Sequence, residues 1–115
     1  MAVFIYKILR QAEWRAAQEA GELTGSPVDL ADGYIHFSTA AQVRETAARH
    51  FSGAADLVLL AVDSGRLGKA LRWEAARGGD LFPHLYEPLS LDRVAGVHQL
   101  PLGADGAHVF AAAGL

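Results

Sequence analysis

The sequence predicts an α+β fold, with one compact domain built from a mixed or antiparallel sheet and two main helices. Two stretches of high helix propensity alternate with five or six short apolar stretches that are typical of strands. Their spacing is too irregular for a doubly wound parallel sheet, and neither glycine-rich phosphate motif is present. With 115 residues, the chain is close to the commonest domain size, so we expect a single domain over 1–115.

The composition excludes several classes of protein. The chain has no cysteine, which removes disulfides, thiolate metal ligands and thiol nucleophiles. Its formal net charge is −3 and its arginines are scattered, which argues against a nucleic-acid scaffold. We identify neither a signal peptide nor an apolar run long enough to span a membrane, and we expect a cytoplasmic protein.

The first strand and the first helix are predicted from propensity and periodicity. Val3–Leu9 is rich in β-branched and aromatic residues on both faces, with Lys7 as an exception, so it belongs inside the sheet. Gln11–Ala20 contains neither Gly nor Pro, and Trp14 and Ala17 are spaced for one buried helical stripe.

A long loop follows this helix. Glu22–Gly33 holds the turn signals Gly-Ser-Pro and Asp-Gly. Within it, Ser26, Pro27 and Asp29 match one capped helical turn, with a cap, a proline at the first position and an acid at the third. Since the loop precedes a strand with a polar face, we expect it to form the rim of a site.

That strand is the segment around which the predicted site is organised. In a strand Tyr34, His36 and Ser38 share one face, because successive side chains alternate. Thr39-Ala40-Ala41-Gln42 then matches a capping box and predicts a helix that runs to about Phe51.

The second half of the chain is predicted to be mostly extended. Asp56–Val62 is a nearly continuous apolar run and is the best candidate for the centre of the sheet. We expect strands at Leu71–Ala75 and Val94–Val97 and a last short strand at His108–Phe110. Because of Pro83, Leu81–Tyr86 is expected to be an edge strand or irregular. The tail Ala111–Leu115 is expected to be frayed.

One group of polar candidates lies where the strand that begins at Tyr34 is expected to meet a helix. His36 has two open interpretations, a structural histidine bonded to a backbone carbonyl or a ligand-binding and acid–base residue. Ser38 lies two residues further on. The free N–H groups of a helix that begins at Thr39 favour an anion such as phosphate, although Thr39 and Gln42 can also satisfy those groups themselves.

A second group lies in the later, loop-rich region. Glu74 follows Trp73, so its carboxyl is a candidate for a raised pKa and for orienting or deprotonating a hydroxyl; the alternative is a salt bridge to Arg72 or Arg77. His84 and Tyr86 can stack on a ring-bearing ligand and bond to it, or simply pack as an aromatic patch. No metal-ligand spacing is present, so we predict no metal site.

The order of short blocks along the chain resembles domain-of-unknown-function family 952 over nearly its whole length. Members of that family are small bacterial and plant proteins without an established activity. The blocks that carry the resemblance include Glu13-Trp14, Asp32-Gly33-Tyr34-Ile35-His36-Phe37-Ser38-Thr39-Ala40, His50-Phe51, Arg72-Trp73-Glu74 and Leu81-Phe82-Pro83-His84-Leu85-Tyr86.

The family is in turn remotely similar to the ADP-ribosyltransferase-like fold, a split β-sheet that binds NAD in a cleft. By that analogy His36 contacts a ribose, Tyr86 stacks on a ring and Glu74 assists attack at the ribose. The order Glu74 then Tyr86 departs from the usual order of histidine, tyrosine and glutamate in such enzymes.

We therefore expect a domain that binds a nucleotide-like ligand, with NAD or ADP-ribose as the leading candidates and NAD as a substrate in the case of an enzyme. The expected reaction is then ADP-ribosyl or phosphoribosyl transfer, in which Arg77 holds an anionic group and Glu74 and His36 are catalytic. The alternatives are a non-catalytic ligand-binding or protein-interaction module, and a hydrolase with a histidine base. The candidate site consists of His36, Ser38, Glu74, Arg77, His84 and Tyr86.

Overall fold

Short helices and antiparallel strands make up the chain. A computed structural model describes residues 2–115, although the side chain of Arg77 lies outside that description. The α-helices are α1 (Gln11–Ala20), α2 (Pro27–Asp32) and α3 (Val43–His50), with short 3₁₀ turns at Ser64–Arg66, Gly68–Ala70, Arg77–Gly79, Leu91–Arg93 and Ala111–Ala113. The strands are β1 (Phe4–Arg10), β2 (Glu22–Leu23), β3 (Ile35–His36), β4 (Ser38–Thr39), β5 (Leu57–Asp63), β6 (Leu71–Ala75), β7 (Leu81–Leu85), β8 (Leu89–Ser90) and β9 (Val94–Gln99).

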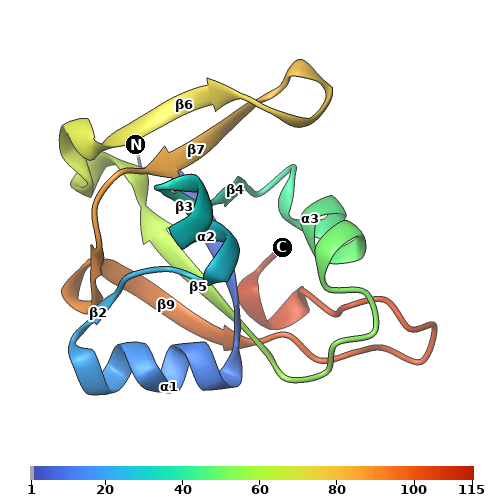
Figure 1. Cartoon of the computed structure of the whole chain (residues 1–115). Helices are drawn as coiled ribbons and strands as arrows, with labels where there is room; N and C mark the ends of the chain where they lie inside the picture. The colour runs from blue at the N-terminus through green and yellow to red at the C-terminus, as the bar shows by residue number, and fades with distance from the viewer. Residues whose placement is uncertain (1) are drawn as a thin grey trace.

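The strands form three sheets, and every pair between them is antiparallel over the described residues. The largest sheet has the order β4-β1-β5-β9, a second has the order β3-β7-β6, and β2 pairs with β8. In Figure 1 the β6–β7 hairpin and α1 lie at opposite ends of the molecule, with α2 and β3 between them. The α+β class is therefore confirmed.

The hydrophobic core lies on both faces of the largest sheet. On one face Ile5 and Leu9 pack with Trp14 and Ala17 of α1. On the other, Tyr6 and Ile8 pack with a second cluster that includes Val43 and Ala47 of α3. Each fully buried Leu or Ile in this core contributes about 1.5–3 kcal/mol. Strands β1 and β5 are interior and apolar on both faces, as predicted.

The segment predicted as one strand and the start of a helix is divided differently. β3 joins β7 in the three-stranded sheet, whereas β4 joins β1 in the largest sheet, and the buried Phe37 lies at the break. The helix begins at Val43 rather than at Thr39, because Thr39 is extended and paired with Ile5. Part of the predicted cap still forms, since the Thr39 N–H donates to Gln42 Oε1 at 3.0 Å.

The prediction of an edge position for the strand around Pro83 is wrong, because β7 lies between β3 and β6. The Pro83 carbonyl accepts a hydrogen bond from the Phe37 N–H at 3.0 Å. A strand residue points its N–H and C=O to the same edge, so the missing N–H of proline faces the place where β3 has ended. The ladder therefore tolerates a proline inside this sheet.

The C-terminal region also differs from its prediction. His108–Phe110 is not a strand and contributes only a single bridge between Leu102 and His108. The tail is not frayed, because Phe110 is 5 % exposed and its carbonyl accepts from the Ala113 N–H at 3.0 Å. Within the described part of the chain, no helix is long and apolar enough to cross a membrane.

Candidate functional site

Strands β3 and β7 bring two histidines side by side. His36 and His84 are direct partners in the antiparallel register, so their side chains lie on the same face of the sheet. Their ring centroids are 5.5 Å apart in an edge-on arrangement. Tyr34 stacks on His84 with a centroid distance of 4.2 Å and lies 5.1 Å from the ring of Tyr86. Four aromatic rings from two segments of the chain thus form one cluster.

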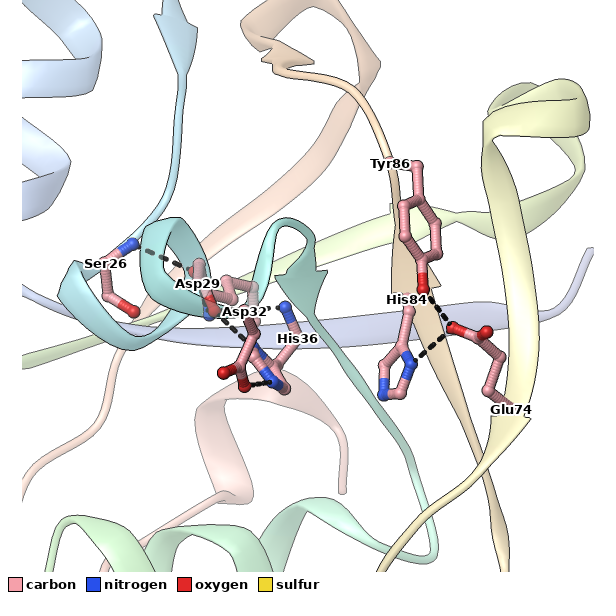
Figure 2. Close-up of polar contacts among 8 residues, drawn as sticks. Ser26, Asp29, Asp32, His36, Glu74, His84 and Tyr86 are labelled. Atoms are coloured by element: carbon pink, nitrogen blue, oxygen red, sulfur yellow. Dashed lines mark hydrogen bonds and ion pairs between the residues drawn. The ribbon is translucent and has the colours of Figure 1, made fainter.

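Glu74 closes the cluster from the neighbouring strand β6. Its Oε1 accepts hydrogen bonds from His84 Nδ1 at 2.9 Å and from the Tyr86 hydroxyl at 2.7 Å, as Figure 2 shows. The guanidinium of Arg72 lies over the Tyr86 ring at 5.0 Å. The structure therefore joins three of the predicted site residues, Glu74, His84 and Tyr86, through one carboxylate oxygen.

These bonds correct the expected ionisation of Glu74. Hydrogen bonds from Tyr86 and then from His84 hold the pKa of the Glu74 carboxyl below its ordinary value, so the predicted increase is wrong. The same contact raises the pKa of the Tyr86 hydroxyl. Proximity to an aromatic ring did not decide the matter, because Glu74 is partly exposed and receives two donors.

His36 is held by two carboxylates of α2. Its Nδ1 lies 2.6 Å from Asp29 Oδ1 and its Nε2 lies 3.0 Å from Asp32 Oδ2 (Figure 2). The His36 backbone N–H also donates to Asp29 Oδ1 at 3.2 Å. Both ring nitrogens of His36 therefore have acidic partners from one short helix.

Asp29 is the buried centre of this arrangement. Its side chain is fully inaccessible, and Oδ2 accepts from Lys7 Nζ at 2.8 Å and from the Ser26 N–H at 2.9 Å. Burial alone raises the pKa of the Asp29 carboxyl, but the hydrogen bond from His36 and the charge of Lys7 outweigh it and hold the pKa far below its usual range. Burial lowers the pKa of the Lys7 ammonium despite the attraction of Asp29.

The sequence pattern identified Asp29 only as a helix-capping acid, and Lys7 only as an exception in an apolar strand. The cap is confirmed, since Asp29 bonds the Ser26 N–H, but the same carboxylate also reaches Lys7 and His36. A single lysine among residues predicted to be buried was the one signal for a hidden acidic partner, because buried charges are paired. Nothing in the sequence identified which acid it was.

Ser38 and Arg77 stand apart from the Glu74 cluster. The Ser38 hydroxyl is 2.8 Å from the Thr46 hydroxyl of α3, and the residue is 4 % exposed. The backbone of Arg77 lies in a 3₁₀ turn of the β6–β7 hairpin, while its side chain lies outside the described part of the structure.

A pocket of about 570 Å³ opens beside the two histidines. Its walls come mainly from β1, α2, α3, β7 and the junction of β3 with β4, and they include His36, Ser38 and His84 but not Tyr34, Glu74 or Tyr86. The wall area of the pocket is mainly apolar, and its polar lining residues include the buried Lys7–Asp29 pair. Among the described residues, no group of His, Asp and Glu has the geometry to hold a metal ion.

The site is thus an aromatic and acidic cluster beside a mainly apolar pocket, in an α+β domain of antiparallel sheets. The chain belongs to the protein family of unknown function DUF952, whose model matches residues 8–97. No curated protein matches the chain.

The chain is also similar to a protein whose structure has been solved, CC0527 from Caulobacter crescentus. Its crystal structure is 53 % identical, with 96 % of each chain covered and a TM-score of 0.91. Its solution NMR structure is 53 % identical, covers 96 % of this chain and 95 % of that one, and has a TM-score of 0.85. These similarities show that CC0527 and this chain have the same fold.

Proposed function

We propose that the protein binds a nucleotide-like ligand of the NAD or ADP-ribose class in the pocket beside His36 and His84. The observation that carries this proposal is the cluster of Tyr34, His36, His84 and Tyr86, in which four rings gather next to a pocket of about 570 Å³. A pocket with aromatic walls and a few polar groups that converge on it is typical of small-molecule sites.

The ring of a base or of nicotinamide meets the cluster at His84, which lines the pocket and is backed by Tyr34, a residue outside the lining. This residue is half-buried and already stacks on His84, so little side-chain entropy is lost when a ligand packs against the cluster. Stacking of a base on an aromatic side chain contributes about 1–3 kcal/mol.

The polar part of such a ligand meets hydroxyl and charged groups. Ser38 lines the pocket, and its hydroxyl is paired with that of Thr46. Arg77 stays in the proposal, on sequence grounds alone, as the group that holds a phosphate. Glu74 does not line the pocket, which favours binding over ADP-ribosyl or phosphoribosyl transfer as the function. Since the proposed ligands are cytoplasmic metabolites, we also retain the cytoplasm as the proposed location.

Ligand-induced thermal stabilisation tests the proposal. NAD, ADP-ribose and 2′-phosphorylated nucleotides are screened against the wild-type protein, Tyr34→Ala and the control Glu45→Gln, which changes an exposed ion pair of α3. At one hundred times its Kd a true ligand stabilises the fold by about 2.7 kcal/mol. We expect this gain in the wild type and the control, and a much smaller gain in Tyr34→Ala.

The opposite result has a clear meaning. If no nucleotide raises the midpoint of wild-type unfolding, the proposal is wrong, and the protein is better regarded as a non-catalytic interaction module.

A further inference from the structure

The two histidines of the cluster differ in which of their nitrogens are occupied. His36 has a carboxylate at each ring nitrogen, from Asp29 and Asp32. His84 has one carboxylate, Glu74, at Nδ1, and its Nε2 has no hydrogen-bond partner among the side chains that the structure describes. This difference matters because His84 is only 4 % exposed, and a buried polar atom without a partner is unusual.

The open nitrogen lies on the edge of the ring that is turned away from Glu74. Since His84 and His36 line the pocket and Glu74 does not, we place this edge of the imidazole at the pocket wall. In Figure 2 the second ring nitrogen of His84 is turned away from Glu74, on the side where His36 lies. The bond from Nδ1 to Glu74 fixes this orientation, because a half-turn of the ring would keep the stack with Tyr34 and break that bond.

Glu74 decides the chemical character of that nitrogen. An ionised carboxylate can only accept a hydrogen bond, so Nδ1 must carry the proton in the bond to Glu74 Oε1. In the neutral imidazole Nε2 then keeps its lone pair and is an acceptor. The Tyr86 hydroxyl donates to the same oxygen, and the lowered pKa of the Glu74 carboxyl keeps the acid ionised.

We infer that His84 Nε2 accepts a hydrogen bond from a hydroxyl group of the bound ligand, and that Glu74 is the positioning residue that sets this tautomer. The ligand class rests on the proposed function, in which the ribose supplies the hydroxyl. His84 then determines specificity, because a ligand that presents a hydroxyl to Nε2 is accepted. One that presents a carbonyl or phosphate oxygen there is rejected, because two acceptors would face each other.

The tautomer can be measured without any ligand. A long-range proton–nitrogen correlation spectrum of labelled protein is recorded about two pH units above the ordinary histidine pKa of about 6.5. We expect His84 with its proton on Nδ1 and an unprotonated Nε2 in the wild type and in Glu45→Gln. In Glu74→Ala we expect the proton to redistribute between the two nitrogens. A wild-type His84 with its proton on Nε2 would overturn the inference.

Titration with ADP-ribose then separates this inference from the proposed function. If both hold, the Tyr34 ring signals and the His84 Nε2 signal move together and saturate at the same concentration. If the Tyr34 signals move while the Nε2 signal does not, the ligand binds without touching His84 and the inference fails alone. If no signal moves at saturating concentrations, the proposed function fails, and the ribose hydroxyl is lost from the inference with it.

Discussion

The two acidic groups around the histidines differ in how completely they are closed. In the first, the buried Asp29 bonds Lys7, Ser26 and His36, and Asp32 takes the remaining nitrogen of His36. In the second, the partly exposed Glu74 bonds His84 and Tyr86 and leaves one nitrogen of a buried ring open toward a pocket. A network in which every polar group is bonded stabilises the fold, whereas a network with an unbonded nitrogen can also form a hydrogen bond with a ligand.

The position of each acid explains this difference. Asp29 lies on α2 and joins it to β1 and β3, so its bonds connect three elements of the core. Glu74 lies on β6, an outer strand of the three-stranded sheet, and its bonds stay within the β6–β7 region. Substitutions should therefore cost stability around Asp29 and change ligand contacts around Glu74.

The largest expected effect is the loss of stability in Asp29→Ala. Removal of one partner from a buried ion pair leaves the other charge without compensation, which costs about 3–5 kcal/mol. Urea denaturation measures this loss. Asp56→Ala is the matched control, because the Asp56–Arg10 pair is exposed and such pairs contribute about 0–1 kcal/mol. Equal losses in the two variants would show that the Asp29 network is not structural.

The second prediction concerns acid. Because the folded-state pKa of Asp29 is depressed, its stabilising contribution is present above the unfolded-state pKa of about 3.9 and is lost as the pH falls below that value. The wild type should lose up to about 1.4 kcal/mol per pH unit more than Asp29→Asn does in this window. Parallel pH profiles for the two proteins would contradict the assignment.

A smaller effect separates the two histidines. His36→Phe breaks a bond to a buried, charged carboxylate, which costs about 1.5–3 kcal/mol. His84→Phe should cost less, because it breaks one bond to a carboxylate that water can still solvate and keeps its stack on Tyr34. Urea midpoints of the two variants are compared directly. A greater loss in His84→Phe would reverse the comparison between the two regions.

The smallest effect on stability is expected for Glu74→Gln. The side chain of Glu74 is 38 % exposed and Gln can still accept a hydrogen bond, so the urea midpoint should stay within experimental error of the wild type. A clear drop in the midpoint would mean that the Glu74 cluster is part of the structural core.

Helix propensity and turn residues predicted the elements whose ends are set by neighbouring residues in the sequence. The bounds of α1 agree with the prediction because propensity and a following glycine define them, and Gly21 adopts φ 81° at the helix end. The division of the segment after Tyr34 between two sheets was not predictable, because it depends on the distant partners Ile5 and His84. The strand around Pro83 was predicted to be an edge strand for the same reason, because the residues near Pro83 in sequence do not indicate that β3 pairs with this strand and ends at His36.

In the candidate site, too, neighbouring residues predicted some features and distant contacts determined the others. The alternation correctly put His36 and His84 on polar faces, but Ser38, which was predicted to share the strand of His36, lies in β4 of the largest sheet. The contacts among Glu74, His84 and Tyr86 agree with their grouping in sequence. Asp29 and Asp32 were missed, because an acid in a short helix usually serves a cap or faces solvent. Only the folded chain brings α2 against β3.

Stabilisation by ADP-ribose in His84→Phe tests most directly whether the open histidine belongs to a ligand site. The increase in the unfolding midpoint at a fixed ligand concentration is compared among the wild type, His84→Phe and the control Glu45→Gln. We predict an increase in the wild type and the control, and its loss in His84→Phe. An undiminished increase in His84→Phe, or none in the wild type, would contradict the assignment of this region to ligand binding.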